Sequence, residues 1–275
     1  MSNPPSDVLY EVEHLHLSLP DLTRKPLLGP APRIHILNDL SFKIRRGEVM
    51  GIVGGSGSGK STLGRALVRL LEPTGGHVRF DGTDITHLGE GELRPLRRRF
   101  QMIFQDPMSS LNPRRTVGAI IEAPLGLHGF DDLAKRAAEA LDQVGLPRAF
   151  ARRYPHELSG GQRQRVGIAR AIAMRPDFIL ADEIVSGLDV SSQAQVLNLL
   201  EGLVKDLGLT LAFISHDLSV IRRLCQRILV LHRGVIAPGD ADAAEALFAA
   251  HGWDPAWRNG IYTHHHFHSN AHEAL

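Results

Sequence analysis

Four continuous apolar segments are the clearest pattern along the chain. They occupy residues 48–55, 177–183, 209–217 and 227–239, and each ends in glycines or in polar residues. Continuous apolar runs are typical of parallel strands that are covered on both faces, whereas half-exposed strands alternate. Helix-like segments separate the runs. This order of strands and helices predicts a doubly wound α/β core.

The segments between and after these runs predict helices and a tail. We expect residues 60–71 to form a helix directly after the first strand, and the pattern of residues 131–145 clearly predicts a helix. Residues from about 89 to 157 are rich in Arg and Ala, and we interpret them as a helical insertion. Residues 251–275 are rich in His and weakly patterned, and we expect them to be poorly ordered. An amphipathic helix is predicted over residues 191–208, with an apolar stripe at Val196, Leu199, Leu200, Leu203 and Leu207.

The composition limits the class of protein. The 275 residues are 43% hydrophobic and carry a formal net charge of +1, so the chain can bury a sizeable core. The charge gives no case for nucleic acid, and we interpret the basic stretch at residues 94–100 as a solvated face. The single cysteine, Cys225, excludes an internal disulfide and suits a small buried residue.

Neither a secretion signal nor a membrane-spanning segment is visible in the sequence. The first ten residues lack a basic stretch followed by an apolar one. No apolar run approaches the roughly 20 residues that are needed to cross a bilayer. We therefore expect a protein that is soluble, or that lies against a membrane through a partner.

The first chemical motif is GGSGSGKST at residues 54–62, which matches G-x-x-x-x-G-K-[ST]. Glycines allow backbone N–H groups to surround phosphate oxygens, and the following helix adds its positive end. Lys60 would reach the β- and γ-phosphates, and the Ser61 hydroxyl would bind Mg²⁺. The predicted phosphate site consists of Gly54, Gly55, Ser56, Gly57, Ser58, Gly59, Lys60, Ser61 and Thr62.

Two acidic residues, Asp182 and Glu183, follow the apolar run FILA and supply a second part of this chemistry. Asp182 ends the predicted strand and suits the Mg²⁺ shell. Glu183 stands where the chain leaves the sheet and could polarise the attacking water. Taken alone, two acids after an apolar run more often mark the start of a helix. In a chain that also contains a phosphate loop, they favour a catalytic pair.

A second anion site is predicted at LSGGQRQRVGIARAI, which begins at Leu158. Ser159 can cap a helix that runs to about Met174, and no acid occurs before Asp177. A helix start with two glycines and no acid is suited to an external anion. Since one nucleotide needs only one phosphate loop, this second helix suggests a head-to-tail pair of subunits that share two sites. In the alternative interpretation, the glycines permit tight helix packing.

Five motifs in this order, GGSGSGKST, LSGGQRQR, ILADE, SGLD and FISHD, resemble the ATP-binding subunits of ABC transporters. The resemblance implies a P-loop NTPase core that is RecA-like with a mainly parallel sheet, an antiparallel β subdomain and an inserted helical subdomain. It places the ATP-binding domain at residues 1–250, with the signature helix at 158–174. It assigns catalytic or ATP-contacting roles to Gln105, Asp182, Glu183, Asp189 and His216. Gln105 would contact Mg²⁺ and the lytic water, and Ser159, Gly160, Gly161 and Gln162 would contact ATP across a dimer.

Longer stretches, such as FQDPMSSLNPRRTV and VSGLDVSSQAQVLNLL, are similar to importers for dipeptides, oligopeptides and nickel. Within that group they resemble the second of two non-identical ATPases, which implies a heterodimer, with a homodimer as the alternative. The resemblance further implies two transmembrane permease subunits, an extracytoplasmic solute-binding protein and a peripheral position on the cytoplasmic face of the inner membrane. Peptides are the expected cargo, with nickel or another small solute as the alternative. The rival classes are a soluble ABC ATPase without a transporter and a regulatory subunit that does not hydrolyse ATP.

Several positions depart from the pattern of this family. Ile184 and Gly187 stand where Pro and Ala are usual, and Gly55 replaces an acid in the phosphate loop. Leu19 occupies the expected place of an aromatic residue that stacks on adenine, and His14 or His16 are candidate substitutes. The tail carries His264, His265, His266, His268 and His272, which suit either a metal-binding segment or a solvated tail.

Overall fold

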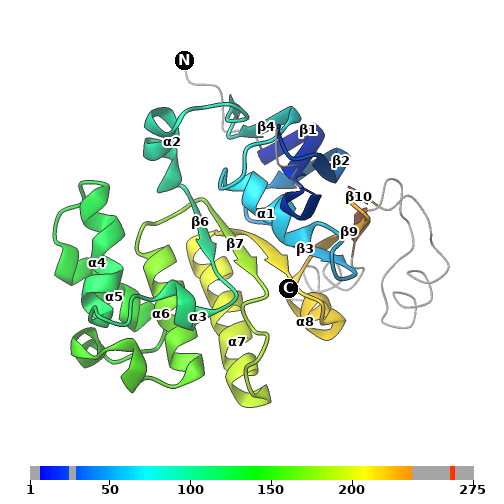
Figure 1. Ribbon diagram of the computed structural model, residues 1–275. Coiled ribbons are helices and arrows are strands. Elements are labelled where there is room, and N and C mark those ends of the chain that lie inside the picture. Colours follow the sequence, from blue (N-terminus) through cyan, green and yellow to red (C-terminus); the bar gives the residue numbers. More distant parts are fainter. Residues whose placement is uncertain (1–6, 25–28, 237–260, 264–275) are drawn as a thin grey trace. The chain divides into compact units, whose positions relative to one another are not determined.

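The computed structural model describes residues 7–24, 29–236 and 261–263. The chain divides into two compact units (Figure 1). Unit 1 comprises residues 1–89 and 216–275, and unit 2 comprises residues 90–215. The tail histidines from His264 onward lie outside the described residues.

One sheet of unit 1 is antiparallel, with the strand order β2-β1-β4-β5. A short 3-10 turn, η1 (Leu22–Arg24), follows its first strand. The four strands are β1 (Val8–Pro20), β2 (Arg33–Arg45), β4 (Gly75–Phe80) and β5 (Thr83–Asp84).

Bulges keep the apolar residues of β1 and β2 on one face of this sheet. The buried residues Val12, Leu15 and Leu17 are spaced by three and then two positions, and the register shifts between Val12 and Leu15. His14, in the extra position, has a positive φ of 49°. A bulge adds one residue to a strand and thereby corrects the alternation of its side chains.

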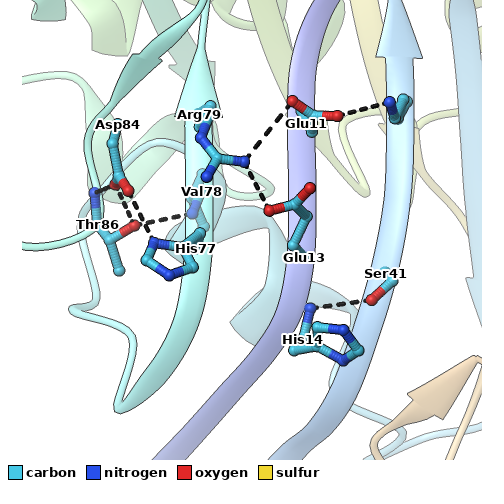
Figure 2. A network of polar contacts seen from close by, with 10 residues as sticks. Glu11, Glu13, His14, Ser41, His77, Val78, Arg79, Asp84 and Thr86 are labelled. Atoms are coloured by element: carbon cyan, nitrogen blue, oxygen red, sulfur yellow. Dashed lines mark hydrogen bonds and ion pairs between the residues drawn. The ribbon is translucent and has the colours of Figure 1, made fainter.

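The opposite face of the antiparallel sheet carries a network of charged and polar side chains (Figure 2). Arg79 Nη1 lies 2.6 Å from Glu13 Oε2 and 3.7 Å from Glu11 Oε2. His77 Nδ1 lies 2.8 Å from Asp84 Oδ2. Cross-strand pairs of opposite charge on one face are a normal way to stabilise an antiparallel sheet.

The other strands of unit 1 build the support of the phosphate loop. Strand β3 (Val49–Gly54) pairs in parallel with β9 (Arg227–His232), and β10 (Val235–Ile236) and β11 (Ile261–Thr263) pair antiparallel with β9. Helix α1 (Lys60–Leu67) follows β3, and α8 (Leu218–Leu224) precedes β9. Strand β11 lies within the tail that we expected to be poorly ordered, so residues 261–263 depart from that expectation.

Unit 2 contains three parallel strands in the order β8-β7-β6. They are β6 (Phe100–Ile103), β7 (Phe178–Asp182) and β8 (Thr210–Ile214). All residues of β7 and β8 are buried, as the continuous apolar runs predict. Strand β6 lies inside the segment that we interpreted as helical, and it pairs with β7 from Phe100 to Ile103. The interpretation of this segment as a helical insertion is therefore wrong for these four residues.

Helices make up the rest of unit 2, and α4, α5 and α6 lie side by side (Figure 1). Their buried residues face one another, which explains why the Ala-rich segment at 133–143 is helical and apolar on one side. The helices are α2 (Glu90–Arg97), α3 (Pro107–Ser110), α4 (Val117–Leu127), α5 (Leu133–Gln143), α6 (Gly160–Ile172) and α7 (Val190–Leu207), with the 3-10 turns η2 (Arg148–Arg152) and η3 (Pro155–Glu157).

Helix α7 corrects the predicted apolar stripe. Val196, Leu200 and Leu203 are buried, but Leu207 is 48% exposed and Leu197 is buried. The packed face of α7 is therefore rotated toward Leu197 and ends before the last turn. Gly208 ends the helix as predicted, with a left-handed φ of 61°.

Across residues 7–24, 29–236 and 261–263, no helix combines the length and the apolar character that a membrane span requires.

Candidate functional site

The phosphate loop of unit 1 is a turn in which glycine is required at specific places. Gly54 and Gly59 have φ values of 153° and 102°. A Cβ atom on Gly54 would lie 2.2 Å from the carbonyl oxygen of Leu231, and one on Gly59 would lie 2.9 Å from Leu37 Cδ2. Side chains at these positions would push the loop away from β9 and β2. The loop backbone is thus in close contact with β9 at Gly54 and with β2 at Gly59. By contrast, Cβ atoms on Gly55 and Gly57 would meet nothing within 4 Å.

Helix α1 begins in this loop with a bare N-terminus. Gly59 is its N-cap and makes no side-chain cap bond, and the first turn contains no acidic residue. Lys60 Nζ donates hydrogen bonds to the carbonyl oxygens of Gly54 and Gly55, at 2.8 and 2.9 Å. A lysine folded over its own loop is positioned to exchange these carbonyls for phosphate oxygens.

Ser58 gives an independent test of whether a phosphate group fits this loop. Its hydroxyl oxygen is buried and has no hydrogen-bond partner within the described part of the chain. A buried hydroxyl without a partner costs free energy unless a ligand or water satisfies it. Among the other predicted residues, Gly55, Ser56 and Gly57 are exposed, and Ser61 and Thr62 are half-buried in the first turn of α1. The loop therefore fits a phosphate ligand.

Two segments to which the sequence analysis assigned no role in the site support the loop through backbone bonds. The Gly234 N–H donates to Ser58 O at 3.0 Å, and the Asn38 N–H donates to Gly234 O at 2.8 Å. Gly234 has a φ of 81°, and a Cβ atom there would lie 2.2 Å from Ile36 O. The only sequence signal for this support is the Arg-Gly pair after β9, which is typical of a tight turn.

Unit 2 brings together two of the predicted catalytic residues. Gln105 Nε2 donates a hydrogen bond to Glu183 Oε2 at 3.0 Å. Asp182 ends β7 and is only 3% exposed, which suits an acid that binds a cation rather than water. Glu183 has a φ of 50°, and its N–H donates to Ile214 O at 3.0 Å. A bulky residue in the left-handed region is strained, and such strain often marks a functional position.

The predicted cap of the signature helix is present. Ser159 Oγ accepts a hydrogen bond from the Gln162 N–H at 3.3 Å, and Gln162 Oε1 accepts one from the Ser159 N–H at 3.0 Å. This capping box starts α6 at Gly160, and the helix ends at Ile172, two residues before the predicted end. The first turn contains no acid, as the sequence predicts.

Asp189 and His216 occupy the starts of the next helices. Asp189 is the N-cap of α7 and accepts hydrogen bonds from Ser192 through both carboxylate oxygens. His216 is exposed, two residues after the end of β8, and the following Asp217 caps α8. The phosphate loop and His216 belong to unit 1, whereas Gln105, Asp182, Glu183, Asp189 and the signature residues belong to unit 2.

The two histidines that were considered for adenine stacking have other neighbours. His14 Nδ1 lies 2.7 Å from Asp39 Oδ1, and the His16 side chain packs over Gly75. Leu19 is half-buried. The residues packed against the phosphate loop from β2 are instead Ile36 and Leu37.

Comparison with known proteins identifies the family of the chain. A family model described as ABC transporter matches residues 37–186. The protein BOV_A0347 of Brucella ovis carries the name of a peptide import ATP-binding protein. It is 53% identical to this chain over 219 residues, which cover 78% of this chain and 68% of that protein. The oligopeptide transport ATP-binding protein AppF of Bacillus subtilis is 51% identical over 205 residues, covering 73% of this chain and 62% of AppF.

A solved structure gives the same architecture. The dimeric post-hydrolysis state of the ATP-binding cassette MJ0796, bound to ADP and Pi, superposes with a TM-score of 0.73 at 32% identity. The match covers 84% of this chain and 97% of that one. The predicted fold, a mainly parallel sheet with an antiparallel β subdomain and a helical region, is confirmed.

Proposed function

Because the chain belongs to the ABC transporter family of ATP-binding proteins, we propose that it is the ATP-hydrolysing subunit of a peptide importer. The identity of about half of the residues to proteins named for peptide and oligopeptide import supports this cargo. The observation that carries the proposal within the molecule is the phosphate loop. Its glycines exclude side chains, its lysine lies over the loop, and its buried Ser58 hydroxyl has no partner in the described residues.

ATP binding is assigned to the loop at residues 54–62 and the start of α1. Backbone N–H groups and the helix N-terminus bind the phosphates, and Lys60 neutralises the charge of the β- and γ-phosphates. Ser61, Asp182 and Gln105 are the candidate ligands of Mg²⁺. A bound Mg²⁺ would neutralise charge that develops on the phosphate oxygens.

Hydrolysis is assigned to Glu183 and the residues beside it. Glu183 accepts a proton from the attacking water, and Gln105 orients the carboxylate through the hydrogen bond at 3.0 Å. His216 is the candidate donor to the γ-phosphate. The bare start of α6, with Ser159, Gly160, Gly161 and Gln162, would contact the γ-phosphate that a second subunit binds.

A dimer of such cassettes is therefore part of the proposal, and the MJ0796 cassette was solved as a dimer. We propose a second, similar ATPase as the partner, together with two permease subunits and an extracytoplasmic solute-binding protein. This assembly places the chain on the cytoplasmic face of the inner membrane. Closure of the dimer around ATP would exclude water and would switch the permease.

An uptake assay tests the proposal. The gene is deleted in its native cell, and uptake of a radiolabelled dipeptide is compared after complementation with wild type, Lys60→Ala or Glu183→Gln. Wild type should restore uptake and both variants should not, although all three proteins should accumulate equally on immunoblots. Uptake that is unaffected by the deletion would contradict the proposal. If complementation with wild type restores uptake of radioactive nickel and has no effect on uptake of the dipeptide, the cargo is nickel rather than a peptide.

A further inference from the structure

The starts of helices α6 and α7 meet at Gly161 and Ser192, both in unit 2. A Cβ atom on Gly161 would lie 3.1 Å from Ser192 Oγ and 3.2 Å from Ser192 Cβ. The neighbouring Gly160 is less crowded, because a Cβ atom there would lie 3.7 Å from Leu188 Cδ2. The distance of 3.7 Å at Gly160 is an ordinary van der Waals contact, whereas the distance of 3.1 Å at Gly161 is shorter than ordinary contact. Of the two glycines, Gly161 is therefore the one that α7 requires.

Ser192 has a second role on its other side. Its N–H donates to Asp189 Oδ1 at 2.9 Å, and its hydroxyl donates to Asp189 Oδ2 at 2.7 Å. These two bonds lower the pKa of the Asp189 carboxyl, since both are made to the ionised form. The carboxylate is thus tied at both oxygens and cannot turn away from α7 without losing a hydrogen bond.

The same two helices are linked again one turn further along. Arg165 Nη2 donates a hydrogen bond to Gln195 Oε1. Arg165 follows Gly161 by four residues and Gln195 follows Ser192 by three, so both contacts lie along one seam between the helices. Two contacts at successive turns fix the register of α6 against α7.

We propose that Ser192 is a positioning residue that joins the start of the signature helix to the Asp189 segment. Ser192 contacts Gly161 on one side and binds Asp189 on the other, so the start of the signature helix and the Asp189 carboxylate should move together. When the dimer closes, as the proposed function requires, both groups therefore arrive at the partner together. A side chain at position 161 would require Ser192 of the same chain to shift by a few tenths of an ångström, in addition to any need for close approach to phosphate.

A set of variants in the assembled transporter complex tests this relationship. Gly161→Ala should lower the ATPase kcat about tenfold, because its methyl group displaces Ser192 and with it Asp189. Ser192→Gly removes both crowding atoms and should raise the kcat of the Gly161→Ala protein more than threefold. Ser192→Ala removes the hydroxyl but leaves the Cβ atom at 3.2 Å, so it should rescue less than Ser192→Gly.

The controls separate this inference from a general loss of structure. The Ser192→Gly and Ser192→Ala single variants should keep the wild-type affinity for ATP, since Ser192 is not assigned to the ATP site and the phosphate loop is in unit 1, and melting temperatures should show that each protein folds. A double variant that gains less than threefold over Gly161→Ala would overturn the role of Ser192. If the wild-type complex does not hydrolyse ATP at all, the proposed function fails instead.

Discussion

Gln105 and Glu183 are joined by a hydrogen bond of 3.0 Å, although 78 residues separate them in the chain. Gln105 follows strand β6, and Glu183 follows strand β7, which pairs with β6 in parallel. Since parallel neighbours end at the same edge of a sheet, both side chains emerge side by side. The bond orients the carboxylate that we assign as the base.

Replacement of Glu183 by Gln should separate ATP binding from hydrolysis. The amide is nearly isosteric but cannot accept the proton of the attacking water. The steady-state ATPase rate of the assembled complex should fall by about 10²–10⁴-fold. ATP binding should persist, and the closed dimer should accumulate on size-exclusion chromatography with ATP and Mg²⁺. Normal turnover of this variant in the presence of its partner would refute the assignment.

Replacement of Gln105 by Ala should show that the pair acts as a unit. Without the amide, the carboxylate loses its orienting bond, and we expect the kcat to fall by about 10- to 100-fold, since a hydrogen bond to a charged group contributes roughly 1.5–3 kcal/mol and each ~1.4 kcal/mol is tenfold in rate. Gln105→Asn is the matched variant, because its shorter side chain does not span the distance and should behave like alanine. At saturating Mg²⁺, where the loss of Gln105 as a candidate metal ligand is compensated, the double variant with Glu183→Gln should be no slower than Glu183→Gln alone. Multiplicative losses would indicate that the two residues act independently.

Sequence reasoning located the elements around the motifs because local signals define them. Apolar runs that end in glycine or acid became β3 and β7, and Ser159 with Gln162 formed the predicted capping box. The fold class and the family followed from these motifs. The roles assigned to Glu183, Gln105 and His216 stay predictions.

The features that the sequence did not reveal depend on contacts between distant segments. Strand β6 is only four residues long within an Arg-rich stretch, so its apolar run is too short for a periodicity argument. Leu207 is exposed and Leu197 buried because neighbouring elements, rather than the helical period alone, define the packed face of α7. Likewise, the contact of Ser192 with Gly161 joins residues that are 31 positions apart.

Asp84 should make the stability of unit 1 sensitive to acid. Burial alone would raise the pKa of its carboxyl, but hydrogen bonds from the Thr86 hydroxyl, the Thr86 N–H and His77 lower it to about 2. A folded-state pKa below the unfolded value gives stability that is present near neutral pH and is lost as the pH falls through about 4 toward 2. Asp84→Asn should lower the free energy of unfolding at pH 6 by no more than about 1 kcal/mol, because the side chain is partly exposed and screened.

Urea unfolding at two pH values checks this prediction. The difference between wild type and Asp84→Asn should shrink by about half at pH 3, where part of the contribution is already lost in the wild type. Asp7→Asn serves as the control, since Asp7 is exposed and its carboxylate Oδ2 lies 3.9 Å from Arg45 Nε, a long ion pair. A difference that is independent of pH would show that the charge of Asp84 does not contribute.

Of the two adjacent glycines of the phosphate loop, only Gly54 should be sensitive to replacement by alanine. A methyl group on Gly54 would lie 2.2 Å from Leu231 O and would occupy a backbone with a φ of 153°. Neither the carbonyl of β9 nor the loop can yield without breaking the sheet, so Gly54→Ala should cost more than about 2 kcal/mol of stability. A Cβ atom on Gly55 meets nothing within 4 Å, and Gly55→Ala should change stability by less than about 0.5 kcal/mol. Thermal unfolding and titration with a fluorescent ATP analogue measure the effects on stability and on ATP binding.

Gly54→Ala should lose ATP binding at temperatures where it is still folded, and Gly55→Ala should keep it. Equal stability and equal affinity of the two variants would contradict the close contact between the phosphate loop and β9.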